Sequence, residues 1–204
     1  MTRDATARLF VAVDPPAQVC EGLLGWARTA LARLPVGRGR GALADMRLLE
    51  AEALHVTLCF LGGRPVGEID VIASALSGCA MEVGELSLGA PLWLPPRRPR
   101  ALAVEIHDPD GGLTRLHGAL REALADATGW QPERRRFKAH ITVARMRGRS
   151  AGWRRFAQAR EPPLPATPPL SFTPASIVLY RSWLSPAGAS YQALATCELL
   201  AAER

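Results

Sequence analysis

The sequence predicts an α+β fold in which two pseudo-symmetric lobes, each with an antiparallel sheet and helices on its outer face, face one another across a central cleft. Two observations lead to this prediction. The order strand, helix, strand occurs twice, beginning at residues 9–13 and again at 101–106, and each occurrence ends in a His-x-Thr segment, at 55–58 and at 140–143. Because a half-buried sheet must cover its apolar face with helices, the polar faces of the two sheets are left to meet.

The first half of the chain alternates between strand and helix patterns. An apolar, partly β-branched run at residues 8–14 predicts a buried strand, which Pro15 and Pro16 end. Apolar residues then recur at helical spacing as far as Leu34. The elements expected in this half are strands at 8–14, 46–49 and 54–61, and helices at 17–34 and 66–79.

The second half repeats the alternation and adds a hairpin. Leucines at helical spacing predict a helix that begins after the turn at 108–112 and ends near Gly129. Six prolines between residues 162 and 174 predict an extended connection. The elements expected here are strands at 81–93, 101–106 and 137–146, helices at 113–129 and 153–159, and a β-hairpin of 176–184 with 190–199.

Length and composition indicate an ordinary globular protein. With 204 residues, 48% hydrophobic and 22% charged, the chain can bury a core without disulfides, and we expect residues 1–204 to form one bilobal domain. The net charge of +6 favours an anionic partner. Lys138 is the only lysine, so 24 of the 25 basic residues are arginine, and this skew prevents the charge alone from deciding the function.

The cysteines and apolar runs predict a reduced protein of the cytoplasm. Four cysteines are widely separated and form no Cys-x-x-Cys pair, so we expect no zinc site and no other metal or cofactor. No stretch approaches the ~20 apolar residues that a membrane span requires. Cys59 shares the predicted strand face of His55, but the two lie about 13 Å apart at ~3.3 Å per residue, too far for a Cys/His nucleophile.

Each His-x-Thr segment presents an imidazole beside a hydroxyl. Side chains alternate across a strand, so His55 and Thr57 share one face, as do His140 and Thr142, while the residues between them are aliphatic. Cleavage of a cyclic phosphodiester needs one proton taken from water and one given to the departing oxygen, and two imidazoles can perform both transfers. The hydroxyls can hold the non-bridging phosphate oxygens.

The repetition favours a functional role for the two histidines. A single histidine in a strand is more often structural than catalytic. With ten threonines in 204 residues, however, a threonine follows a given histidine at the second position by chance about once in twenty. Two such cases among four histidines, at equivalent places of a repeat, predict a shared site.

The motifs and their surroundings resemble the 2H phosphoesterases, which are named for two H-x-T/S-x motifs on a bilobal fold. The resemblance is to the branch of RNA 2',3'-cyclic phosphodiesterases, also called 2'-5' RNA ligase-like proteins. It implies hydrolysis of an RNA end with a 2',3'-cyclic phosphate to a 2'-phosphomonoester, with 2'-5' ligation as a possible reverse reaction. The H-x-T-x spacing itself predicts no metal, and with no obligate protein partner inferred we expect a monomer. The segments that carry the resemblance are RLFVAV at 8–13, HVTLCFLG at 55–62, FKAHITVAR at 137–145 and VLYRS at 178–182.

The resemblance also implies roles for individual residues. His55 would be the acid that protonates the leaving 3'-oxygen, and His140 the base that activates water. Thr57 and Thr142 would bind the phosphate. Arg145, five places after the second histidine, matches an arginine of the family that could pair with phosphate charge.

Strand alternation complicates the assignment of two further residues. Arg145 and Phe60 each follow a histidine at an odd spacing of five, so a regular strand would turn both away from the cleft. A bulge or a strand end would have to redirect them. Phe60 is either a base-stacking platform or a core residue, and Phe10 is expected in the core.

Two other functions remain open from the sequence. The chain could be a non-catalytic module that binds RNA ends, or a related enzyme acting on another cyclic phosphate or on a 2'-5' linked nucleotide. The basic runs at 97–100 and 134–136 are either contacts for an RNA backbone or solvated loops. His107 and His117, which have no partner motif, are expected to be solvated or to pack.

Overall fold

The computed structural model describes residues 5–33, 46–96, 99–146, 164–185 and 188–201. The strands of this part form one nine-stranded sheet in the order β7-β4-β5-β6-β3-β1-β8-β9, with β2 also paired to β6. Every strand pairing in it is antiparallel, as predicted. The fold is α+β.

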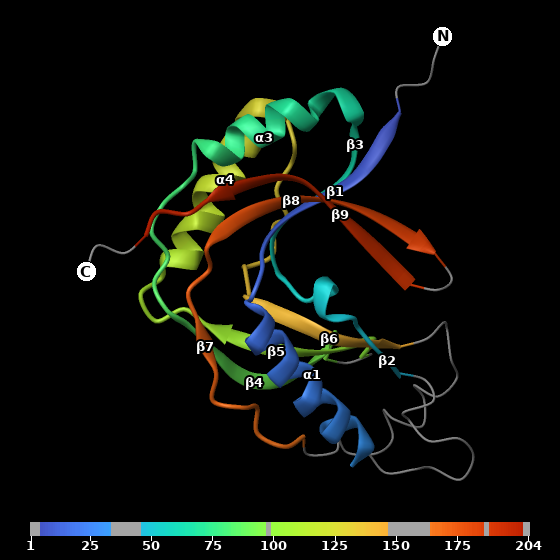
Figure 1. Ribbon diagram of the computed structural model, residues 1–204. Coiled ribbons are helices and arrows are strands. Elements are labelled where there is room, and N and C mark those ends of the chain that lie inside the picture. Colours follow the sequence, from blue (N-terminus) through green and yellow to red (C-terminus); the bar gives the residue numbers. More distant parts are fainter. Residues whose placement is uncertain (1–4, 34–45, 97–98, 147–163, 186–187, 202–204) are drawn as a thin grey trace.

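The sheet consists of two parts that define two lobes (Figure 1). The first lobe contains β1 (Thr6–Val13), β3 (Val56–Pro65), β8 (Ser176–Ser185) and β9 (Gly188–Glu198). The second lobe contains β2 (Met46–Leu48), β4 (Leu86–Leu94), β5 (Ala101–His107), β6 (His140–Met146) and β7 (Ser171–Phe172). The two parts are joined by one pair of facing residues, Val56 of β3 and Ile141 of β6.

The helix of each strand-helix-strand repeat covers the other lobe. Helix α1 (Ala17–Ala32) follows β1 of the first lobe but packs against β2 and β6 of the second. Helix α4 (Gly112–Thr128) follows β5 of the second lobe but packs against β3 and against α3 (Ile69–Ser77), which also contacts β9. The lobes are therefore not the consecutive halves of the chain, because each lobe contains strands from both halves, and α1 and α4 each cover the lobe opposite the strand that they follow.

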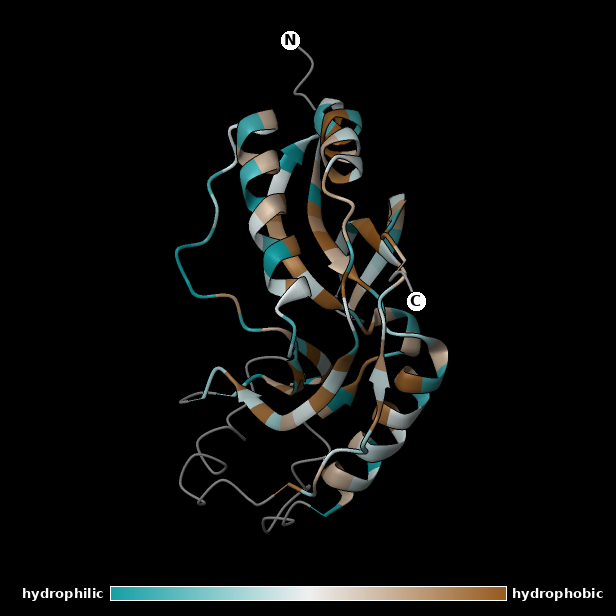
Figure 2. Ribbon diagram, turned by 90° about the vertical axis from the view of Figure 1, so that its left-hand side faces the viewer, coloured by the Kyte–Doolittle hydropathy of each residue, from teal (hydrophilic) through white to brown (hydrophobic). Residues whose placement is uncertain are grey.

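Amphipathic helices produce this packing. In Figure 2 apolar and polar segments alternate along the helices, as expected where one face is buried against a sheet. The predicted leucines of α4 are completely buried, and Gly129, with a φ of 63°, ends that helix in the left-handed conformation. No helix of the described ranges is long and apolar enough to cross a bilayer. The buried leucines are Leu113, Leu116, Leu120 and Leu124.

Most predicted elements are confirmed, with differences at their ends. β3 continues past Gly62 and Gly63 to Pro65, because these glycines remain paired with β1. Only 86–94 of the strand expected at 81–93 pairs as β4, and β6 begins at His140. The helix expected from Val66 begins with a 3-10 turn, η2 (Val66–Glu68). The two-residue β7 within the proline-rich connection was not predicted, and the helix expected at 153–159 lies outside the described residues.

The junction of the lobes predicts a large stability effect. Ile141 is completely buried where β6 meets β3, so Ile141→Ala removes packing from both lobes and should lower the free energy of unfolding by roughly 2–5 kcal/mol. Val71, which is 45% exposed on α3, provides the control. Val71→Ala should change the free energy of unfolding by less than about 0.5 kcal/mol. Urea denaturation measures both values. Equal effects would show that the junction contributes no more than the surface.

Candidate active site

The pairing of β3 with β6 brings the two motifs together. Val56 faces Ile141, and both side chains are completely buried. This single facing pair brings the two motifs together. Because side chains alternate along a strand, the residues that flank the buried pair, His55 and Thr57 in one motif and His140 and Thr142 in the other, lie on the opposite face.

A bulge follows the threonine in both motifs. On β6, Thr142 pairs with Ala103 and Ala144 pairs with Leu102, which leaves Val143 as the extra residue. On β3 the partners of Thr57 and Cys59 are consecutive residues of β1, which leaves Leu58 as the extra residue. The two bulges occupy the same position, three residues after the histidine.

These bulges redirect the residues at the fifth position. Leu58 and Cys59 are both buried, and Phe60, which follows them, is 37% exposed. In the second motif Val143 and Ala144 are buried, and Arg145 is exposed. Arg145 and Phe60 therefore lie on the same side of their strands as the threonines, which meets the condition that strand alternation imposed on the sequence prediction.

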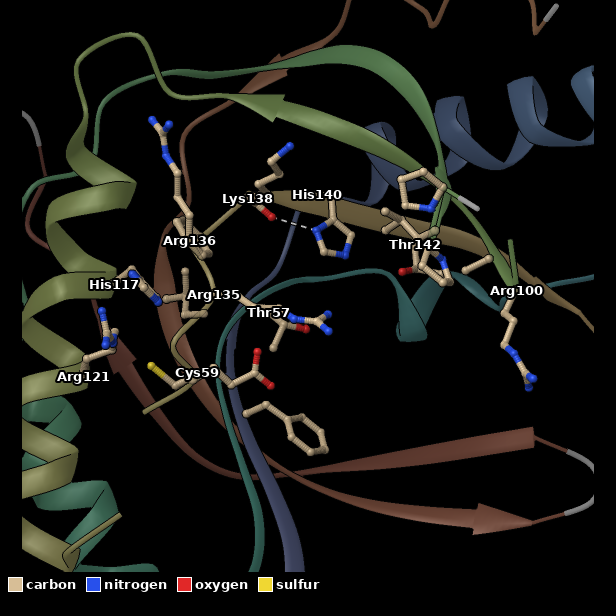
Figure 3. A pocket seen from close by; sticks show the side chains of 18 of the residues that line it. Thr57, Cys59, Arg100, His117, Arg121, Arg135, Arg136, Lys138, His140 and Thr142 are labelled. Atoms are coloured by element: carbon tan, nitrogen blue, oxygen red, sulfur yellow. Dashed lines mark hydrogen bonds between the residues drawn. The ribbon is translucent and has the colours of Figure 1, made fainter. Parts of the chain in front are cut away.

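A cavity of about 610 Å³ lies beside the paired motifs (Figure 3). Its walls come from β3, the end of β4, the start of β5, α4, β6 and the segment between α4 and β6. Five of the six predicted site residues line it, and His55 does not. We call this space the central cavity. Its residues with polar, charged or exposed aromatic side chains include Thr57, Phe60, Arg100, His117, Arg121, Glu133, Arg135, Arg136, Lys138, His140, Thr142 and Arg145.

His55 is enclosed by aromatic rings. Its ring centroid lies 4.8 Å from that of Phe10, 5.3 Å from Tyr191 and 6.2 Å from Tyr180. The hydroxyl of Tyr180 donates a hydrogen bond of 2.5 Å to Asp14, and burial raises the pKa of that carboxyl. Sequence analysis missed this aromatic cage, apart from expecting Phe10 to be buried.

The surroundings of His55 strongly favour its neutral form. Burial, with smaller contributions from the charges of Arg145 and His140, lowers its pKa to about 4, although a hydrogen bond with the backbone of Ala53 opposes this shift. His55 is therefore within electrostatic range of two residues of the second motif. Without an anion nearby, its ring is uncharged at neutral pH.

The His140 ring has a fixed orientation. Its Nδ1 lies 2.7 Å from the carbonyl oxygen of Lys138, drawn as a dashed line in Figure 3. A carbonyl can only accept, so Nδ1 carries the proton and Nε2 of the neutral ring keeps its lone pair. Both histidines thus bond the backbone two residues before them, His140 at Lys138 and His55 at Ala53.

Comparison with known proteins identifies the family. The model of the 2'-5' RNA ligase superfamily matches residues 28–183. The chain belongs to this superfamily. A relative named RNA 2',3'-cyclic phosphodiesterase from Escherichia coli (strain K12) is 34% identical over 140 residues, which span 68% of this chain and 71% of the relative. One of the same name from Archaeoglobus fulgidus is 29% identical over 69% of this chain and 73% of its own.

Solved structures agree with this membership of the 2'-5' RNA ligase superfamily. The crystal structure of the protein TT0787 of Thermus thermophilus has a TM-score of 0.69 at 25% identity and covers 94% of this chain and 97% of its own. The structure of E. coli LigT complexed with 3'-AMP has a TM-score of 0.74 at 22% identity, over 96% of this chain and 99% of its own. Both likenesses show the bilobal α+β fold of the 2H phosphoesterases.

Cys59 is not an accessible nucleophile in this superfamily member. The bulge at Leu58 turns Cys59 into the interior, where it is 2% exposed, so the expectation that it shares the face of His55 was wrong. Burial raises the pKa of its thiol to about 12, although the neighbouring charge of Arg121 opposes this effect. The thiolate is therefore not available at neutral pH.

The wall of the central cavity away from the motifs is basic. Among the described residues that line the cavity, five besides Arg145 are cationic, and Glu133 is the one carboxylate. Part of the predicted basic run at 134–136 lies here, whereas residues 97 and 98 are outside the described ranges. His117, expected to be solvated or to pack, stacks on Phe137 with ring centroids 4.1 Å apart. No group of three or more His, Cys, Asp or Glu that could hold a metal occurs in the described part.

The charge of Arg145 should control the protonation of His55. Arg145→Met removes the positive charge that lowers the pKa of His55, so this pKa should rise above about 4. NMR titration of the His55 ring measures it. Arg100→Met is the matched control, because Arg100 lines the same cavity but is not among the causes of the shift. An unchanged His55 titration in Arg145→Met would place the two side chains too far apart to interact.

His55 should also make the stability of the protein depend on pH. The unfolded chain takes up a proton at His55 near pH 6.5, whereas the folded chain takes it up near pH 4. A fall in pH through this window therefore favours the unfolded state. When the pH falls from 7 to 5, the free energy of unfolding of the wild type should decrease by about 1–2 kcal/mol more than that of the His55→Asn variant. This follows because one pKa unit corresponds to ~1.4 kcal/mol. Equal losses in urea denaturation would contradict a buried neutral ring.

Proposed function

We propose that this protein hydrolyses the 2',3'-cyclic phosphate at the end of an RNA chain to a 2'-phosphomonoester. The observation that carries the proposal is the pairing of Val56 with Ile141, because it joins the two His-x-Thr motifs beside a cationic cavity. Relatives named for the same activity support it.

His140 is the base in this proposal. Its Nε2 carries a free lone pair once Nδ1 donates to Lys138, and it takes a proton from a water molecule. The oxygen of that water forms a bond to phosphorus while the bond between phosphorus and the 3'-oxygen breaks. His55 gives its proton to the departing 3'-oxygen. The phosphate stays on the 2'-oxygen, and one proton has been taken and one returned.

The phosphate itself makes His55 able to act as an acid. In the free protein the charge of Arg145 contributes to a pKa of about 4, so little of the His55 ring is protonated at neutral pH. A cyclic phosphate bound between the motifs carries a negative charge close to both side chains. That charge offsets Arg145 and favours the imidazolium form of His55. Substrate binding and protonation of the acid are therefore coupled.

The remaining site residues hold the substrate. The hydroxyls of Thr57 and Thr142 donate to the non-bridging oxygens, and the Arg145 guanidinium pairs with the phosphate charge. Phe60, exposed at the cavity, stacks against the terminal base. The guanidinium of Arg8 lies 4.5 Å from the centre of the Phe60 ring and holds it in place.

We further propose that the protein acts in the cytoplasm as a monomer without a metal or cofactor, and that it can run the reaction in reverse as a 2'-5' ligation. Its four cysteines are all free thiols, which accords with a reducing compartment.

The decisive experiment is incubation of purified, EDTA-treated protein with an oligoribonucleotide that ends in a 2',3'-cyclic phosphate. We expect a 2'-phosphate product, and at least ~10²-fold slower turnover in His55→Ala and in His140→Ala, because each removes a proton transfer. His107→Ala is the control, since His107 lies outside the central cavity. A 3'-phosphate product, or a strict need for added metal, would contradict the mechanism.

The rate should depend on pH in a specific way. Plots of kcat/KM and of kcat against pH should both be bell-shaped, because one histidine must be neutral and the other protonated. The kcat curve should lie at higher pH than the kcat/KM curve, because the bound phosphate anion raises the pKa of His55 from its low value in the free protein. Coincident curves would rule out the coupling between substrate charge and His55.

A further inference from the structure

Arg121 is a cation without a counter-ion at the end of the central cavity. Its Nε atom is buried and has no hydrogen-bond partner among the described residues. Within the same ranges, Arg64 is the only arginine with a carboxylate at salt-bridge distance, 2.6 Å from Glu68. The Nε–H group of Arg121 is thus a hydrogen-bond donor without an acceptor among these residues.

Such a donor is costly unless something pairs with it. A buried polar group without a hydrogen bond costs ~1–3 kcal/mol, and a buried charge without a partner costs more. Arg121 as a whole is partly exposed and lines a cavity that a ligand can enter, so an anion there can pair with its guanidinium group. The planar guanidinium fork fits the two oxygens of a phosphate group.

Arg121 of α4 lies near Cys59 of β3, because its charge affects the pKa of the Cys59 thiol. Figure 3 shows Arg121 and His117 at the same end of the cavity as Cys59, with His140 and Thr142 toward the other end. Cys59 follows Thr57 by two residues, which span at most ~7 Å of extended chain. The part of β3 between Thr57 and Cys59 is therefore about as long as one nucleotide step along a single strand.

We propose that Arg121 forms a second phosphate subsite, which binds the phosphodiester between the last two nucleotides of the RNA. The cyclic phosphate then lies at the paired motifs while the preceding phosphate lies at Arg121. This inference rests on the proposed function and specifies its substrate as a chain of at least two nucleotides. Arg135 and Arg136 on the same basic wall point to an extended polyanion rather than a single nucleotide.

The test compares two substrates in one set of variants. The first is a nucleoside 2',3'-cyclic phosphate, and the second is a dinucleotide with the same cyclic end. Arg121→Met should reduce kcat/KM for the dinucleotide by roughly 10–100-fold, the worth of one charge-assisted hydrogen bond, and that for the mononucleotide by less than about threefold. Arg121→Lys should lose less than Arg121→Met, because it keeps the charge.

The control variant is Arg115→Met on the same helix. Arg115 donates to the carbonyl of Asp110, is exposed and does not line the central cavity, so both substrates should be unaffected. Equal losses for both substrates in Arg121→Met would show that Arg121 only packs α4 against β3, and would overturn the proposal. No loss for either substrate would overturn it as well.

Equilibrium binding separates the subsite from the chemistry. A dinucleoside monophosphate contains the internal phosphodiester but no cyclic end, so its binding requires no turnover. We expect binding to the wild type, observed as a shift of the His117 ring signals in NMR spectra. In Arg121→Met the slope of log affinity against log salt should fall by about 0.7, as for one phosphate contact on a single strand.

The results distinguish failure of the subsite from failure of the proposed function. Arg121-dependent binding of the dinucleoside monophosphate by a protein that cleaves no cyclic phosphate would retain the subsite and remove the function. Cleavage with no preference for the dinucleotide would retain the function and remove the subsite. Binding of inorganic phosphate at Arg121 without any binding of the dinucleoside monophosphate would overturn the assignment to an RNA chain.

Discussion

The contact between Val56 and Ile141 is the constraint on which the whole site depends. It is the place where the sheets of the two lobes pair, and both side chains are fully buried there. Because alternate residues of a strand point to opposite faces, burial of this pair places His55, Thr57, His140 and Thr142 together on the other face. A slip of one residue in either strand would exchange the faces and bury the imidazoles. Core packing therefore sets the geometry of the chemistry.

The bulges solve a second geometric problem. Two strands that meet at one pair can present only two residues each to the gap, so further contacts must come from positions that regular alternation hides. An extra apolar residue after each threonine returns the fifth position to the cavity. The duplication has kept this device in both halves, although one half uses it for Phe60 and the other for Arg145. The two motifs thus have the same bulged backbone and differ in the side chain at the fifth position.

Sequence periodicity predicted most strands and helices because these depend on local patterns. The repeated His-x-Thr segments led to four site residues and the family resemblance added Arg145 and Phe60, and five of these six line the central cavity. The adjacent apolar residues at 58–59 and 143–144 break the alternation of a regular strand, and this break is a sequence signal of the bulges. The sequence could not predict that α1 and α4 each cover the opposite lobe, because this depends on which sheet each helix contacts after folding. Tyr180, Tyr191 and Arg121 were missed for the same reason, because they meet the site only through long-range packing.

The electrostatics of the cavity follow from this arrangement. Aromatic rings lie around His55, and burial disfavours its charge. Arg145 and the basic wall supply positive potential, and Glu133 is the one carboxylate among the described residues that line the cavity. The positive side chains of the cavity are therefore unpaired in the free protein, which costs some stability. A phosphate anion that binds in the cavity removes that cost. In the proposed mechanism the same anion restores the proton that His55 needs. Attraction of the substrate and protonation of the acid would then both follow from the uncompensated positive charge of the cavity.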